Sequence, residues 1–170
     1  MKPNTDRSFI TFMAALAIGA LGAITSLHAF ARDSSENTIV MVCEHGSVKS
    51  LMAASIFNRR AKERGLPFHA VSHGVNPDAT VPAKISEALS RDGYNVSRFV
   101  PTLATTENLT NARRVVAIGV DLSAIAPAVA AKASRWDDVP AASMDYAAAR
   151  AAIEKHIELL LDELAGTASR

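Results

Sequence analysis

The chain has 170 residues, a formal net charge of +1 and a single cysteine. This length favours one domain, and the near-neutral charge gives no indication of a nucleic-acid or anionic-membrane partner. One cysteine excludes an internal disulfide, so the hydrophobic core alone must hold the domain together.

The first part of the chain has the pattern of a targeting segment. Residues 9–27 are almost wholly apolar and carry no charge, and Ala29 and Ala31 form the small-x-small pattern that signal peptidases cut. Arg32 is then the expected first mature residue. Because about 20 apolar residues can cross a bilayer, an uncleaved N-terminal anchor is the alternative, and only then is the membrane a partner.

Three regions are therefore expected. Residues 1–31 are predicted to be a signal peptide or anchor, residues 32–37 a polar linker, and residues 38–166 an exported domain, periplasmic or secreted. Strands are predicted at residues 38–42, 68–75, 113–120 and 134–136. Helices are predicted between Ser50 and Gly65 and at residues 83–91, 122–132 and 144–165, with residues 76–82 as a loop. Pro127 must either kink the helix of residues 122–132 or lie in its first turn.

Strands that alternate with helices predict an α/β fold. The expected architecture has three layers, α/β/α, around a central parallel four-stranded sheet. Ligands of such sheets bind beyond the carboxyl ends of the strands. Cys43 follows the first predicted strand directly, so it is expected at this edge.

The sequence "CEHGSVKS", residues 43–50, joins the first strand to the first helix and contains a glycine. In such a loop the backbone N–H groups converge on its centre, and the helix N-terminus adds partial positive charge. Lys49 adds a full cation, which together with the loop favours the thiolate form of Cys43. The residues between them, expected to surround a bound oxyanion, are Glu44, His45, Gly46, Ser47 and Val48.

This arrangement resembles the low-molecular-weight protein tyrosine phosphatases, whose fold thioredoxin-coupled arsenate reductases share. The family has a cysteine, five residues, a basic residue and a serine between its first strand and first helix. The resemblance covers essentially the whole domain. It includes "VSHGVNP" (residues 71–77), "KISEALSRDGYNVSRFVPTL" (84–103), "RRVVAIG" (113–119) and "WDDVP" (136–140).

The resemblance implies a role for each matching residue. Cys43 would be the nucleophile that forms a phosphocysteine, Lys49 would clamp the phosphoryl oxygens, and Ser50 would stabilise the thiolate. Asp138 would protonate the leaving group, with Asp137 as its rival. The family needs no metal and no cofactor, and its partner is a phosphorylated or oxyanion substrate.

The sequence departs from the family pattern at two positions. Lys49 replaces an arginine, and lysine cannot make the planar two-point contact with two oxygens. Val139 separates the aspartates from Pro140, whereas the family places its acid directly before proline. Both departures leave open an oxyanion-binding or catalytically weakened module instead of an efficient phosphatase.

Three further interpretations remain open from the residues. Cys43 could be a buried structural thiol, and Cys43, Glu44, His45 and His73 could together hold a metal, although their spacing fits no known zinc pattern. An arsenate reductase of this family resolves its adduct with further cysteines, which this chain lacks. Arsenate reduction would therefore need an external thiol, and phosphoester hydrolysis is the simpler expectation.

Overall fold

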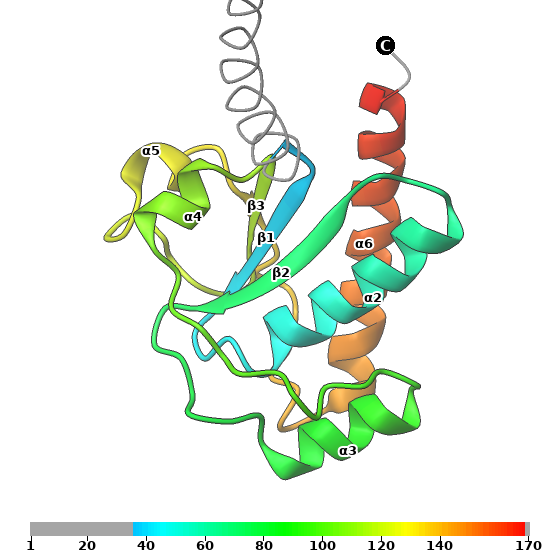
Figure 1. Ribbon diagram of the computed structural model, residues 1–170. Helices are drawn as coiled ribbons and strands as arrows, with labels where there is room; N and C mark the ends of the chain where they lie inside the picture. Colours follow the sequence, from blue (N-terminus) through cyan, green and yellow to red (C-terminus); the bar gives the residue numbers. More distant parts are fainter. Residues whose placement is uncertain (1–35, 169–170) are drawn as a thin grey trace, which may run out of the picture. The chain divides into compact units, whose positions relative to one another are not determined.

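The computed structural model describes residues 36–168, which form a parallel sheet with helices on both faces (Figure 1). The predicted signal peptide or anchor, and all but the last two residues of the predicted linker, lie outside the described residues. Among residues 36–168, no helix has both the length and the apolar character needed to cross a membrane.

The sheet has four strands in the order β2-β1-β3-β4, and every neighbouring pair is parallel. This confirms the predicted three-layer α/β/α architecture. The strands are β1 (Thr38–Cys43), β2 (His69–Gly74), β3 (Arg114–Ala117) and β4 (Ser134–Arg135). The helices that follow them in chain order are α2 (Lys49–Glu63), α3 (Ala83–Arg91), α4 (Thr106–Thr110), α5 (Pro127–Ala130) and α6 (Tyr146–Ala168).

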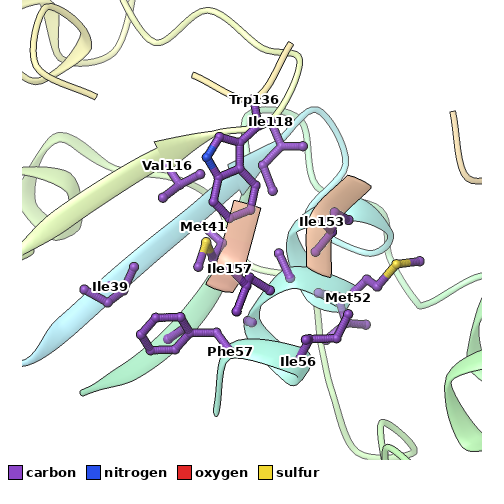
Figure 2. Packing of buried hydrophobic residues seen from close by; sticks show 14 of the residues in the cluster. Ile39, Met41, Met52, Ile56, Phe57, Val116, Ile118, Trp136, Ile153 and Ile157 are labelled. Carbon is purple, nitrogen blue, oxygen red and sulfur yellow. The ribbon is translucent and has the colours of Figure 1, made fainter. Parts of the chain in front are cut away.

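Both faces of β1 are buried, which explains its continuous apolar sequence. Ile39 and Met41 belong to the larger core cluster, which α2 and α6 close from one side (Figure 2). Val40 and Val42 alternate with them and face the smaller cluster, which includes Leu109 of α4. Successive side chains of a strand point to opposite faces, so β1 holds the two helical layers together and is fixed in register.

The structure differs from the predicted elements in two regions. The stretch at residues 122–132 is helical only over α5, so the helix is shorter than predicted. Pro127 lies in its first turn, which is one of the two places expected for it, and the residues before it do not extend the helix. The helix α4 was not predicted. It begins at a capping box in which Thr105 accepts from the Asn108 N–H and the Asn108 side chain accepts from the Thr105 N–H.

The carboxyl ends of β1 and β2 lie side by side, since Cys43 pairs with Gly74 in the register. The chain leaves β1 through the loop of residues 43–50, and the first turn of α2 follows directly. The loop therefore lies at the sheet edge where ligands of parallel sheets bind.

Candidate active site

The first half of the 43–50 loop is fixed by hydrogen bonds from the end of β2 and the residues after it. The Cys43 carbonyl accepts from the Val75 N–H (3.1 Å), and the Glu44 carbonyl accepts from the Asn76 N–H (2.8 Å). The His45 carbonyl accepts from the Asp78 N–H (3.1 Å). One residue further, the Gly46 carbonyl accepts from the Ser72 hydroxyl (2.9 Å). The carbonyls of residues 43–46 therefore all point toward β2 and the residues after it.

The N–H groups of the loop must point the other way. In a trans peptide, the carbonyl of one residue and the N–H of the next lie on opposite sides. Residues 44–47 therefore direct their N–H groups away from the β2 side, and within residues 36–168 none of the N–H groups of residues 44–48 donates to a protein acceptor. A concave group of free N–H donors is an anion-binding site. We name residues 43–50 the anion loop.

Two glycines make this curvature possible. Gly46 has a positive φ of 66°, a conformation that costs residues with a Cβ energy. Its backbone also lies against Gly74, because a Cβ added to either glycine would come within 2.7 Å of the other's backbone nitrogen. The anion loop and the end of β2 can approach this closely only because both residues lack a side chain.

The Cys43 thiol is buried and hydrogen-bonded to a serine network. Its Sγ lies 3.0 Å from Ser50 Oγ and 3.5 Å from the Ser50 N–H, and the residue is 3% exposed. Ser72 Oγ lies 2.8 Å from Ser50 Oγ. If Cys43 is a thiolate, Ser50 can donate to the sulfur while Ser72 donates to Ser50 or Gly46. The network thus satisfies a thiolate with the hydroxyl protons that are present.

Lys49 supplies a cation that no carboxylate of the described chain neutralises. The side chain is half-buried at the first residue of α2, and within residues 36–168 it makes no ion pair or hydrogen bond. Its Nζ lies only 2.8 Å from the place where a Cβ of Gly119 would be. The ammonium therefore sits beside the end of β3 and is available to an anion.

The two aspartates expected to act as the general acid are both engaged elsewhere. Asp137 makes a two-point contact with Arg135 (2.9 and 3.0 Å), and Asp138 lies 2.7 Å from Nε2 of His156. The hydrogen bond from His156 lowers the pKa of Asp138, which favours its carboxylate form. Neither aspartate contacts the anion loop through a hydrogen bond among the described residues. Their role as proton donors stays a prediction.

Two histidines, His45 and His73, and a third aspartate, Asp78, also belong to the site. Asp78 accepts from the Ser47 hydroxyl, and its other oxygen lies 3.5 Å from Nδ1 of His45. Sequence reasoning did not single out Asp78. His73 bonds to the Thr102 hydroxyl (2.8 Å), and partial burial lowers the pKa of its imidazole.

Within residues 36–168, no three His, Cys, Asp or Glu side chains gather as metal ligands, so the metal interpretation gains no support.

Comparison with known proteins gives one family. Residues 38–168 match the family described as "Low molecular weight phosphotyrosine protein phosphatase". No curated protein matches the chain by sequence.

Several solved structures share the fold. YfkJ from Bacillus subtilis is 19% identical with a TM-score of 0.69, over 76% of this chain and 95% of that one. The YwlE arginine phosphatase from Geobacillus stearothermophilus is 18% identical with a TM-score of 0.62, over 77% and 94%. The tyrosine phosphatase Wzb from Escherichia coli K30, in complex with sulphate, is 16% identical with a TM-score of 0.61, over 75% and 98%.

Proposed function

This chain belongs to the low molecular weight phosphotyrosine protein phosphatase family, and we propose that it is an exported phosphatase that hydrolyses phosphotyrosine or a small aryl or acyl phosphate. The observation that carries the proposal is the anion loop. Within the described residues 36–168, N–H groups without a protein acceptor, a Lys49 ammonium without an ion-pair partner and a buried thiol meet at one sheet edge. This combination places a nucleophile at the centre of an anion cradle.

The reaction proceeds in two displacements. Cys43 Sγ attacks phosphorus, the bond to the ester or acyl oxygen breaks, and a phosphocysteine forms. Water then attacks phosphorus, the S–P bond breaks, and inorganic phosphate leaves with the thiolate restored. The N–H groups of the loop and the Lys49 ammonium stabilise the phosphoryl oxygens in both steps. Ser50 donates to the sulfur whenever it is a thiolate.

The leaving-group proton is the weakest part of this mechanism. Asp138 is held by His156 and Asp137 by Arg135, so protonation is inefficient unless one of them is released. Substrates whose leaving group is a stable anion, such as an aryl oxide or a carboxylate, need this proton least. This favours aryl and acyl phosphates over alkyl phosphates.

Turnover of para-nitrophenyl phosphate by the purified full chain, with a chelator present, tests the proposal. We expect hydrolysis that inorganic phosphate inhibits competitively, and slower hydrolysis of an alkyl phosphate. A rate of hydrolysis that does not exceed the rate in buffer alone would contradict the proposal.

A second candidate is an oxyanion-binding module without efficient turnover. The observation in its favour is the engagement of both aspartates, together with lysine in place of the family's arginine. Two results together would support this candidate against the phosphatase: phosphate protects Cys43 from alkylation, and the protein does not hydrolyse aryl phosphates.

Export is proposed on the sequence of residues 1–31 alone. We expect the protein in the periplasm or the medium, with Arg32 as its N-terminal residue. N-terminal sequencing and cell fractionation measure this. A membrane-bound protein that keeps residues 1–31 would support the anchor instead, and a full-length protein in the cytosol would contradict export.

A further inference from the structure

Asp78 contacts the anion loop at three points, although 31 residues separate it from Ser47. Its carboxylate accepts the Ser47 hydroxyl proton through Oδ2 and lies 3.5 Å from His45 Nδ1 through Oδ1. Its backbone N–H donates to the His45 carbonyl at 3.1 Å. The side chain and the backbone of Asp78 therefore hold His45 and Ser47, two residues in the middle of the loop.

The contact with Ser47 fixes the side chain that follows the Gly46 carbonyl, and Ser72 holds that carbonyl from β2. Ser47 is fully buried, and within residues 36–168 its hydroxyl has only Asp78 as a partner. A buried hydroxyl without a partner is unfavourable, so the Ser47 side chain is held toward Asp78. Its N–H belongs to the same peptide as the Gly46 carbonyl, so the Asp78 contact and the Ser72 bond together determine where that donor points.

The charge of Asp78 does not explain its position. A carboxylate beside an anion-binding loop repels a bound phosphoryl group and the Cys43 thiolate. His45, whose side chain is half exposed at 53%, offsets that charge only while its imidazole is protonated. The favourable contribution of Asp78 must therefore come from its hydrogen bonds, and its charge opposes them.

We propose that Asp78 is a positioning residue that holds the anion loop, through Ser47 and His45, in the shape that binds the phosphoryl group. This inference rests on the proposed phosphatase function. Asp78 does not touch the reacting atoms, so it acts by keeping the N–H groups of residues 45–47 directed at the oxyanion.

Two substitutions separate the hydrogen bond from the charge. Asp78→Ala and Asp78→Asn remove the same negative charge, but asparagine keeps an acceptor for Ser47 and can donate to a neutral His45. We expect kcat/KM of Asp78→Ala to fall by about 10- to 100-fold, as for a slightly displaced catalytic group. Asp78→Asn should stay within about threefold of the wild type, because the loop keeps its shape.

The pH profile of Cys43 alkylation by iodoacetate provides a second measurement. Its midpoint would not change if the substitution only made the protein less stable. Removal of the charge alone shifts the midpoint to lower pH in both variants. A loosened loop weakens the support of the thiolate, so we expect the Asp78→Ala midpoint at higher pH than that of Asp78→Asn. Coincident midpoints and equal kcat/KM values for the two variants would overturn the inference.

A double-mutant cycle with Ser47→Ala tests the route of the effect. If Asp78 acts through Ser47, the double variant should lose little more activity than Asp78→Ala alone; additive losses would contradict a route through Ser47. Asp162→Asn is the charge control, because it removes a carboxylate that pairs with Arg64, the residue directly after α2. We expect its kinetics to be unchanged.

The measurements distinguish this inference from the proposed function. If phosphate fails to protect Cys43 in the wild-type full chain and no aryl phosphate is hydrolysed, the phosphatase proposal fails, and the alkylation midpoints of the variants still decide whether Asp78 positions the loop. If Asp78→Ala does not fold, as judged by circular dichroism, Ser47→Ala takes its place and is compared with the wild type, because both keep the charge of Asp78. We then expect a higher midpoint and a lower kcat/KM for Ser47→Ala, and values equal to those of the wild type would overturn the inference.

Discussion

Cys43→Ser is expected to abolish hydrolysis of para-nitrophenyl phosphate, with a loss of about 10⁴-fold or more in kcat, as for other nucleophile substitutions. The serine oxygen keeps the size of the sulfur to within a few tenths of an ångström. It is, however, protonated at neutral pH. Among the described residues, the side chains of the network around it are the hydroxyls of Ser50 and Ser72, which cannot act as a general base.

The same variant should keep the anion cradle. The carbonyls of residues 43–46 remain tied to β2 and the residues after it, and the Lys49 ammonium is untouched. We therefore expect calorimetry to give a phosphate affinity within about tenfold of the wild type. A Cys43→Ser protein that hydrolyses the ester at the wild-type rate would show that the cysteine is a structural thiol.

Much of the anion loop could be predicted because its parts are adjacent in sequence. The strand, Cys43, Gly46, Lys49 and Ser50 lie within one short stretch, and the apolar run before it predicts β1 from residues 38–42 alone. The resemblance of this stretch to a family indicated the fold, and the sheet order and parallel pairing agree with it. Local spacing thus sufficed for the nucleophile and the expected cradle.

The supports of the loop could not be predicted in this way. Ser72 and Asp78 reach the loop across 26 and 31 residues, and no local pattern marks an aspartate in a polar loop as a partner of Ser47. The sequence "VSHGVNP" is part of the resemblance to the family, but the resemblance gives no role to Ser72. These contacts depend on the register between β1 and β2, which only the folded chain determines.

The general acid shows a different limit of sequence reasoning. The family resemblance implies Asp138 or Asp137 as the acid, because both precede a proline before the last helix. The structure places Arg135 and His156 against them, and His156 also stacks on Trp136 with ring centroids 4.8 Å apart. His156 lies 18 residues from Asp138 on α6, so the competing partner was not visible in the acidic motif itself.

Gly119→Ala is expected to reduce activity by displacing Lys49. Gly119 has a φ of 62°, and a Cβ there would lie 2.8 Å from Lys49 Nζ. Because the atom it meets is the end of a flexible side chain, the ammonium moves and the backbone stays. The cradle then loses a cation at the phosphoryl oxygens. Since removal of one such donor costs about 10²- to 10³-fold in kcat, we expect that loss for Lys49→Met and a loss of about 10-fold or more for Gly119→Ala.

Gly65→Ala is the matched control for the backbone. Gly65 has a φ of 66°, almost the same as that of Gly119, and a Cβ there would meet nothing within 4 Å. Both alanine variants should therefore lose about 1–2 kcal/mol in the free energy of unfolding, the usual cost of the left-handed conformation. Only Gly119→Ala should also lose kcat/KM and phosphate affinity.

A double variant decides whether the loss passes through Lys49. In the Lys49→Met background the ammonium is already absent, so adding Gly119→Ala should change kcat/KM by no more than Gly65→Ala does. If Gly119→Ala is as active as Gly65→Ala, the Lys49 ammonium does not act from the place beside β3, and the lysine contributes no more than the first residue of a helix would. If the losses of Lys49→Met and Gly119→Ala multiply, Gly119 affects the site by a route other than Lys49. If Gly119→Ala lowers kcat/KM only in the protein that has Lys49, the glycine at residue 119 provides the space that the lysine needs to serve this anion loop.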